Sequence, residues 1–344
     1  MPQQPQDYAL VIGIDHYPNY RPLRGPMQDA RDFADWLTDQ HTGGGLDAAH
    51  CKVVLSTEAP IQPVLDHIDT ALDEIYHLVK DDGARRIYFY FSGHGHTSVI
   101  DDVYLCLAKW STNRWSRAAL SFRECCNFLA QCIGFSEIIA LADCCRVRVT
   151  GAAGLPPSVS CVKPLAAAGQ TRIFQAYATE FLNRAYEAEI AAGENRGNAA
   201  PIVQGHFTRA LLQALKGAAA GPQGGVKVSK LKEYLEREVP RIAAEHNHKQ
   251  NVRISHNFDA AQDPILGSAL PMVQDNVEIR FNPERRGIIE LEGPNLTILK
   301  RGDVSTGPWL LTLSRGHYLL HELETGQQKH LRFQPQQEVT RVDF

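Results

Sequence analysis

The 344-residue sequence lacks several features that would assign it to a large class of proteins. No apolar run approaches the roughly 18–20 residues needed to cross a bilayer, so we expect no membrane span. The net charge of −4 gives no basic field, so we expect no nucleic-acid partner. The first residues show no basic segment followed by an apolar stretch, so we find no secretory signal and expect a cytoplasmic protein.

Motifs that hold cofactors or metals are also missing. The chain has no P-loop, no GxGxxG and no CxxC, which argues against a phosphate-binding or redox α/β protein. Its eight cysteines include the adjacent pairs Cys125-Cys126 and Cys144-Cys145. This spacing predicts neither a zinc site nor a disulfide framework. We therefore expect no bound metal and reduced thiols.

Short apolar runs alternate with helical patterns over roughly the first 255 residues, which is typical of an α/β domain. Apolar runs without alternation predict buried strands of a parallel sheet. Apolar residues spaced three and four apart predict amphipathic helices. The predicted strands are residues 8–14, 52–55, 86–91, 103–107, 137–142 and 173–178, and the predicted helices are residues 29–37, 62–80, 122–132, 207–215 and 228–246.

The pattern changes near residues 259–271. From Val277 onward, short β runs are separated by turn residues, which predicts a small β-sandwich. We expect an α/β domain over 1–260, a linker over 261–275 and a β-sandwich domain over 276–344. The sandwich either recognises a partner or simply caps the first domain.

Two predicted strands end in residues that can do chemistry. Residues 86–91 run into Ser92-Gly93-His94-Gly95, and residues 137–142 run into Asp143-Cys144-Cys145. The carboxyl ends of neighbouring parallel strands converge on one crevice. A free thiol is only a few per cent thiolate at neutral pH, and an adjacent imidazole can take its proton and later protonate a leaving amine. Either residue alone is more often structural. Together they predict a nucleophilic site.

Several segments resemble caspase-like peptidases, especially metacaspases and their bacterial relatives. They are ALVIGIDHYPNYRPLRGPMQDARDFADWL, YFYFSGHGH, ALADCC, AYATEFLNRAYE, GHFTRALLQAL and VSKLKEYLEREV. The likeness covers roughly residues 7–255, and SGHG followed about 50 residues later by D-x-C is its most specific part. It implies a caspase-like α/β fold, with a central, mostly parallel sheet flanked by helices. The later β runs resemble the accessory β-sandwich domains of bacterial multidomain proteins.

The resemblance implies a role for each residue of the two strand ends. His94 would be the general base and Cys145 the nucleophile, because the family's nucleophile lies two residues after the Asp that is Asp143 here. The backbone amides of Gly95 and Cys145 would form the oxyanion hole. Cys144 would be a packing residue that points to the other face. The family usually continues with His-Ser-Gly, whereas Arg146-Val147-Arg148 follows here.

The resemblance also implies a substrate pocket formed by Asp29, Ser92 and Asp143. Two carboxylates suit a guanidinium, which predicts cleavage after Arg or, less well, Lys. The alternative for Asp29 is a helix N-terminal residue favoured by the helix dipole. A pocket for Asp would need arginines, and Arg24 has no matching second arginine.

Control and biological role follow from the resemblance alone. It implies a regulated protease of a bacterial stress, cell-death or antiphage defence pathway, with an activating or inhibitory protein partner left open. Arg196, in the polar loop 193–200, is the candidate self-cleavage site, and the alternative is a loop that is not processed. Calcium stays open as an activator, although the chain has no EF-hand-like loop. The alternative function is a catalytically silent caspase-fold scaffold, against which the intact His94 and Cys145 argue.

Overall fold

The computed structural model describes residues 6–113, 118–159, 171–190, 202–221, 224–259, 263–268, 274–282, 286–293, 298–314, 316–333 and 340–344. The chain divides into two compact units, Met1–Leu270 and Pro271–Phe344. Within the described part, no helix has the length and apolar character of a membrane span.

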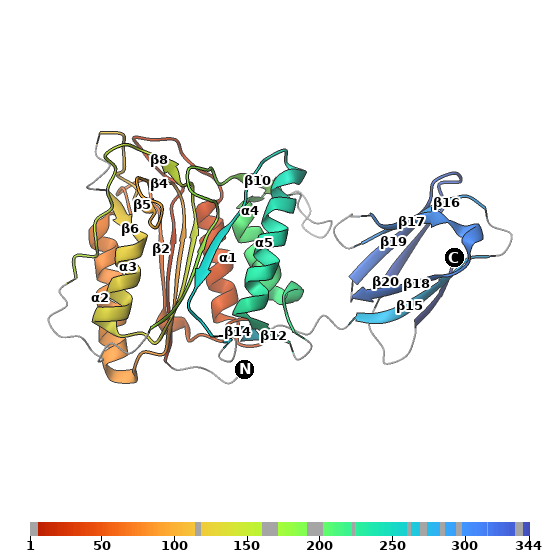
Figure 1. Cartoon of the computed structure of the whole chain (residues 1–344), viewed down its shortest axis with the longest axis horizontal. Helices are drawn as coiled ribbons and strands as arrows, with labels where there is room; N and C mark the ends of the chain where they lie inside the picture. The colour runs from red at the N-terminus through yellow and green to blue at the C-terminus, as the bar shows by residue number, and fades with distance from the viewer. Residues whose placement is uncertain are drawn as a thin grey trace. The chain divides into compact units, whose positions relative to one another are not determined.

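A six-stranded sheet forms the centre of the first unit (Figure 1), in the order β13-β9-β7-β3-β1-β2. All neighbouring strands pair in parallel except β13, which is antiparallel to β9. Strands β1, β3 and β7 are buried along their whole length, which explains why their sequences do not alternate. The predicted α/β fold with a mostly parallel sheet is therefore confirmed. The strands are β1 (Asp7–Gly13), β2 (Cys51–Leu55), β3 (Arg86–Ser92), β7 (Glu137–Asp143), β9 (Arg172–Tyr177) and β13 (Arg253–His256).

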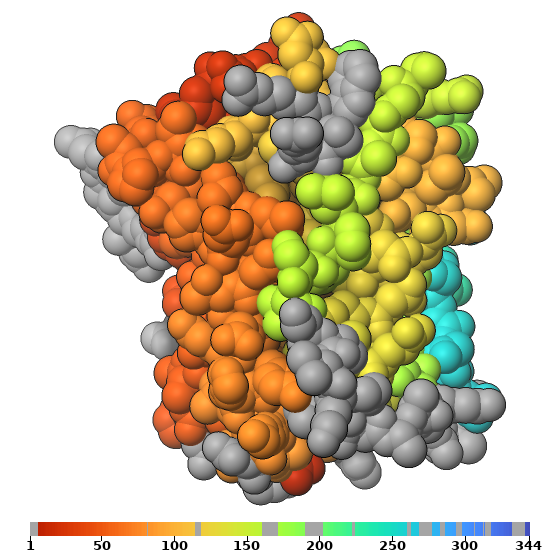
Figure 2. Space-filling model, turned by 90° about the vertical axis from the view of Figure 1, so that its left-hand side faces the viewer, coloured from red at the N-terminus to blue at the C-terminus, as the bar shows by residue number. Residues whose placement is uncertain are grey.

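Helices cover both faces of this sheet. On one face, α1 (Pro26–Thr38), α4 (His206–Gln213) and α5 (Val228–Glu245) contribute to one apolar cluster, and on the other, α2 (Leu65–Asp82) and α3 (Phe122–Phe128) contribute to a second. Figure 2 views the face that carries α2, in orange, and α3, in yellow. The prediction began α2 at residue 62, but proline cannot donate to a helix and restricts the residue before it, so the helix starts after Pro63.

Two smaller sheets extend the carboxyl end of the central sheet. One has the order β6-β5-β4-β8, with β4 (Gly95–Thr97), β5 (Tyr104–Cys106), β6 (Ala119–Ser121) and β8 (Val147–Arg148). The predicted strand 103–107 is thus β5 and belongs to this sheet. The other pairs β10 (Glu187–Ile190) with β11 (Ile202–Gly205) in antiparallel fashion, and the sequence did not predict it. At the opposite end, β12 (Gly225–Lys227) pairs with β14 (Ile265–Ser268).

Six of the described cysteines are free, as expected for reduced thiols, but Cys132 is disulfide-bonded. The prediction of reduced thiols is therefore wrong for Cys132. A disulfide depends on the separation and direction of two side chains in space, which sequence spacing does not fix. The free cysteines are Cys51, Cys106, Cys125, Cys126, Cys144 and Cys145.

The second unit is a small sandwich of two β-sheets, as predicted. Their orders are β18-β15-β21 and β17-β16-β19-β20, and pairing is antiparallel except between β15 and β21. Side chains of both sheets, such as Val277 and Leu291, pack into one apolar core. The strands are β15 (Gln274–Arg280), β16 (Ile288–Glu292), β17 (Ile298–Asp303), β18 (Trp309–Ser314), β19 (Gly316–Glu322), β20 (Gln328–Phe333) and β21 (Thr340–Asp343).

Candidate active site

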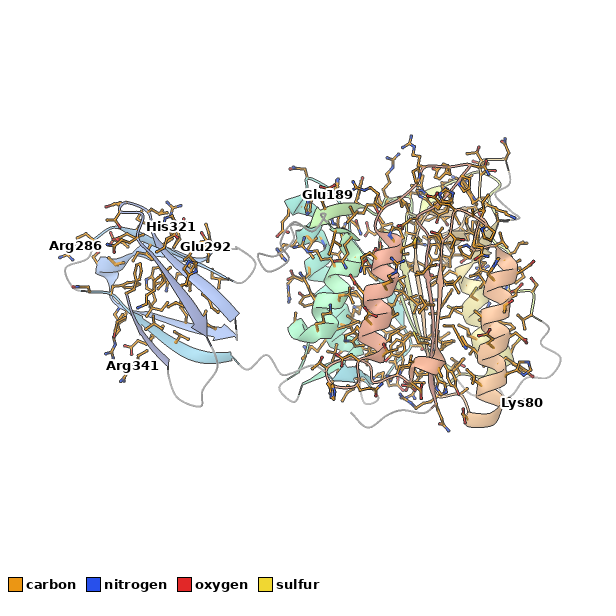
Figure 3. All side chains as sticks on the ribbon, turned by 180° about the vertical axis from the view of Figure 1, so that it is seen from behind. Lys80, Glu189, Arg286, Glu292, His321 and Arg341 are labelled. Atoms are coloured by element: carbon orange, nitrogen blue, oxygen red, sulfur yellow. The ribbon has the colours of Figure 1, made fainter. Side chains whose placement is uncertain are left out.

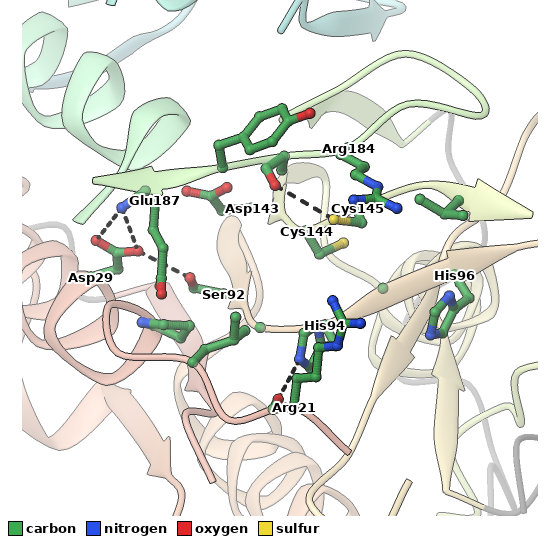
Figure 4. Close-up of a pocket in the computed structure, with 18 of the residues that line it drawn as sticks. Arg21, Asp29, Ser92, His94, His96, Asp143, Cys144, Cys145, Arg184 and Glu187 are labelled. Carbon is green, nitrogen blue, oxygen red and sulfur yellow. Dashed lines mark hydrogen bonds between the residues drawn. The ribbon is translucent and has the colours of Figure 1, made fainter. Parts of the chain in front are cut away.

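The two chemically unusual strand ends lie side by side. Strands β3 and β7 are adjacent, and their last paired residues are Ser92 and Asp143. His94 and Cys145 each follow two residues later, and both line one pocket of about 330 Å³ (Figure 4). The convergence expected from the order of parallel strands therefore exists in the structure.

The His94 ring is held in one orientation by its neighbours. Its Nε2 lies 2.7 Å from the backbone oxygen of Arg21, and its backbone N–H donates to the Tyr17 hydroxyl at 2.9 Å. Because a carbonyl only accepts, Nε2 carries the proton and Nδ1 keeps a free lone pair. The rings of Tyr17 and Tyr20 pack against the imidazole, each with its centroid 4.7 Å away. Burial lowers the pKa of His94, so the ring is neutral at neutral pH.

Cys145 is half-buried, and its thiol donates to the backbone oxygen of Ala185 at 3.5 Å. Burial raises the pKa of this thiol above its ordinary value. The resting site therefore holds a neutral thiol. Cys144 is 2% exposed and belongs to the apolar core that α2 and α3 cover, which fits the packing position expected for it.

Gly95 allows the histidine segment to approach the cysteine segment closely. A β-carbon at this position would lie 2.5 Å from the Cys144 sulfur and 2.6 Å from the Cys145 backbone oxygen. Both distances are too short for a side chain, so only glycine lets β4 start against the nucleophile segment. This contact brings the backbone of Gly95 next to that of Cys145, the two residues predicted to supply the oxyanion hole.

Asp29, Ser92 and Asp143 are brought together at one side of the pocket, where all three are buried. The Ser92 hydroxyl donates to Asp29 at 3.1 Å, and the Gly205 backbone N–H donates to the same carboxylate at 3.2 Å. Asp143 accepts bonds from the backbone N–H and the hydroxyl of Thr208, at 3.1 and 2.7 Å. Asp29 also lies in the first turn of α1, so it occupies a helix N-terminal position and lines the pocket at the same time.

The electrostatics of these two acids are unusual. Burial and the charge of Asp143 raise the pKa of Asp29 well above its ordinary value, and burial raises the pKa of Asp143 to about 6. Two buried carboxylates that share a site resist ionising together. A cation entering the pocket would restore both negative charges.

Sequence reasoning missed several residues that complete the site. Glu187, at the start of β10, lines the pocket, and its carboxylate accepts from the backbone N–H groups of Arg24 and Gly25. Tyr17 and Ala185 were missed because their roles depend on contacts between distant segments. All three carried one weak signal, since each lies in a stretch that resembles the caspase-like peptidases. The Arg24 guanidinium is exposed and bonds Glu189 at 3.0 Å, so the structure places it on the surface.

Among the described residues, the group able to place three metal-ligating atoms close together is Glu290, Glu292 and His321, in the second unit (Figure 3). Its histidine makes it a poor match for calcium, which prefers oxygen ligands. Arg196, the candidate self-cleavage site, lies outside the described residues.

Comparisons with known proteins support the resemblance to caspase-like peptidases. The family model described as "Caspase domain" matches residues 6–262 of this chain. A protein named "Probable protease", from a Desulfuromonadales bacterium, is 31% identical over 105 residues. The match covers 27% of this chain and 12% of the relative, so this chain spans a small part of the length of that protein.

Proposed function

This chain belongs to the caspase-domain family of peptidases, and we propose that it is a metacaspase-like cysteine endopeptidase that cleaves proteins after Arg or, less well, Lys. The observation that carries the specificity is the pair of buried carboxylates, Asp29 and Asp143, beside Cys145 in one pocket.

A guanidinium is the side chain that best fits this pocket. It is planar, always charged, and can donate to two carboxylates at once. Ser92 and Gly205 already donate to Asp29, and Thr208 donates to Asp143, so both acids are held in place before a substrate arrives. An Asp side chain would meet two acids and no cation at this end of the pocket. A lysine can pair with the acids but lacks the fork, which gives the weaker second preference.

The proposed reaction uses His94 as the base and Cys145 as the nucleophile. His94 Nδ1 accepts the thiol proton, and the sulfur attacks the carbonyl carbon of the residue held in the acidic pocket. The C–N bond then breaks, and His94 returns the proton to the leaving amine. In the second half, His94 accepts a proton from water, the water oxygen attacks the thioester carbonyl carbon, the C–S bond breaks, and His94 returns the proton to the Cys145 sulfur. Because the thiol donates to Ala185 in the resting site, a substrate must first displace this contact.

The backbone amides of Gly95 and Cys145 are proposed to stabilise the oxyanion. The close approach of these two segments, which Gly95 permits, supports this role. Backbone donors aimed at the developing charge typically contribute the largest part of catalysis in acyl transfer.

The test uses the purified full chain and fluorogenic peptides that end in Arg, Lys or Asp, with and without calcium. We expect hydrolysis after Arg, weaker hydrolysis after Lys and none after Asp. Cys145→Ala and His94→Ala should lose activity, whereas Cys144→Ala, the matched control in the neighbouring position, should keep it. No turnover by wild type under any of these conditions would favour the caspase-fold scaffold instead. Loss with Cys144→Ala alone would reject the assigned nucleophile.

The wider role is proposed from the resemblance. We propose a cytoplasmic protease of a stress, cell-death or antiphage defence pathway, with few protein targets, control by a protein partner, and self-cleavage at Arg196. Mass spectrometry of the incubated protein, beside Cys145→Ala and Arg196→Ala, tests the last point: a cut after Arg196 that both variants lack supports self-processing.

A further inference from the structure

A second histidine lines the catalytic pocket and is not used by the proposed reaction. His96 is 7% exposed, and neither of its ring nitrogens makes a hydrogen bond of normal geometry within the described part of the chain, although the Val147 backbone lies close enough to act on its pKa. A buried polar group without a partner destabilises the folded state, because it has lost its hydrogen bonds to water. Such a residue, facing a substrate pocket, points to a partner that arrives with the substrate.

The position of His96 relative to the catalytic pair follows from strand pairing. Ser92 and Asp143 are opposite each other on the parallel strands β3 and β7, and His96 and Val147 are opposite each other on the parallel strands β4 and β8. His94 and Cys145 lie between these two pairs along the two segments. The pocket therefore runs from the acidic end, past the catalytic pair, to His96, as Figure 4 also shows.

This order places His96 on the leaving-group side of the scissile bond. The residue before the bond occupies the acidic end, so the chain that follows the bond must continue past Cys145 in the other direction. We propose that His96 is a specificity-determining residue that hydrogen-bonds the side chain immediately after the scissile bond, and that it favours Ser, Thr or Asn there. This inference rests on the proposed function.

The surroundings of His96 define what it can recognise. Its ring stacks on Trp110 with centroids 4.4 Å apart, and the ring of Tyr20 meets it edge-on with centroids 6.0 Å apart. Burial and the nearby His94 lower the pKa of His96 to about 4, so the ring stays neutral at working pH. A neutral imidazole offers one donor and one acceptor. A hydroxyl or carboxamide complements both groups, whereas an aliphatic side chain leaves them without partners.

The test compares two kinds of substrate on the full chain. Internally quenched peptides share one sequence up to Arg and differ only in the next residue, which is Ser, Asn, Ala, Val or Asp. An aminocoumarin peptide ending in Arg carries an aromatic amine, and no amino-acid side chain, on the leaving side. We expect wild type to cleave the Ser and Asn peptides about three- to tenfold better, in kcat/KM, than the Ala and Val peptides, as one hydrogen bond would give.

Two variants separate the roles of the ring. His96→Phe keeps an aromatic ring on Trp110 but cannot hydrogen-bond, so it should reduce the preference to within about twofold and leave aminocoumarin release unchanged. His96→Gln should keep most of the preference. Equal cleavage of all five peptides by wild type, an aliphatic or Asp preference, or an unchanged preference in His96→Phe would overturn the proposal. Loss of aminocoumarin release in a normally folded His96→Phe would also overturn it, because His96 would then belong to the catalytic machinery.

The same experiment keeps this inference separate from the proposed function. Failure of wild type to release aminocoumarin rejects the endopeptidase itself, and the assignment of His96 with it. Efficient release without any selection after the bond rejects the role of His96 alone. The ratios of kcat/KM among the five peptides, measured on wild type, decide this point even if His96→Phe does not fold.

Discussion

The carboxylates of Asp29 and Asp143 both lie against the position that a β-carbon of residue 205 would occupy, and Gly205, which has no β-carbon, leaves that room to them. A β-carbon there would overlap Asp143 and lie 3.1 Å from Asp29. The backbone of Gly205 has φ −64° and ψ 138°, which any residue adopts, so the glycine is needed for room and not for conformation. The two acids and this gap together shape the proposed pocket for arginine.

Filling the gap should block the pocket without removing the nucleophile. We expect Gly205→Ala to lower kcat/KM for Arg peptides at least about tenfold, because the methyl group displaces the Asp143 carboxylate. Alkylation of Cys145 by iodoacetamide should stay within about twofold of wild type. The matched control is Gly221→Ala, whose nearest contact would be an ordinary 3.6 Å, and it should change neither measurement. Full activity of Gly205→Ala would contradict the placement of the arginine side chain.

Because its pKa is raised, the ionised Asp143 should make the folded protein less stable at pH 7 than an uncharged side chain at the same position would. Its pKa rises from 3.8 to about 6 on folding, so the folded state holds the proton more tightly than the unfolded state. Stability is therefore lost as pH rises from about 4 to about 6, and the full penalty remains above 6.

Asp143→Asn removes this penalty, and we expect it to stabilise the protein by about 1–3 kcal/mol at pH 8. The melting temperature should rise by about 2–4 °C per kcal/mol. At pH 4 the variant and wild type should melt within about 1 °C of each other, because the wild-type carboxyl is then protonated. The comparison variant is Asp35→Asn, which is exposed on the same helix as Asp29 and outside the pocket, and it should show no gain at pH 8. A destabilised Asp143→Asn at pH 8 would reject the argument.

Stabilisation by Asp143→Asn should accompany a loss of activity. Removing one of two charge-assisted contacts to a guanidinium costs about 1.5–3 kcal/mol, so kcat/KM for Arg peptides should fall about 10- to 150-fold. In wild type, kcat/KM should also decline as pH falls through about 6, since a protonated Asp143 cannot pair with the substrate. Activity that is flat from pH 7.5 to pH 5.5 would not fit a substrate cation held by these acids.

Alkylation should report the resting state of Cys145. Because burial raises the pKa of its thiol, the thiolate fraction, and with it the alkylation rate, should grow about tenfold per pH unit between pH 7 and pH 9. The rate is followed by mass spectrometry of the peptide that contains Cys145, with Cys145→Ala to identify the signal. A rate that does not change over this range would reveal a preformed thiolate–imidazolium pair, contrary to the neutral pair inferred from the structure.

The Tyr17 hydroxyl should matter for catalysis through His94. It accepts the backbone N–H of His94 at 2.9 Å and donates to the backbone oxygen of Cys106 at 3.1 Å. Tyr17→Phe removes both of these hydrogen bonds, so we expect kcat to fall about 5- to 100-fold from a misplaced ring. Tyr8→Phe is the control, because the buried Tyr8 hydroxyl has no partner among the described residues. It should leave kcat unchanged, and equal effects of the two variants would remove Tyr17 from the site.

Much of the fold could be predicted because the pattern of the central strands depends on local burial. Strands buried on both faces read as unbroken apolar runs, and β1, β3 and β7 were found in that way. The β10–β11 pair was missed, since its strands are short and one of them, β11, precedes a helix directly. The start of α2 was placed three residues early because apolar spacing continued through Pro63.

The sequence by itself determined which chemistry this protein can carry: a histidine and a cysteine at the carboxyl ends of two apolar strands, with the motifs of the caspase family around them. Only the tertiary structure decided how they are used. It made β3 and β7 neighbours and turned Nε2 of His94 toward the backbone oxygen of Arg21. It also placed the backbone oxygen of Ala185 next to the Cys145 thiol, and Gly205 against the carboxylates of Asp29 and Asp143. The physical reason is that these contacts join segments 40 to 176 residues apart, and packing alone selects among such pairings.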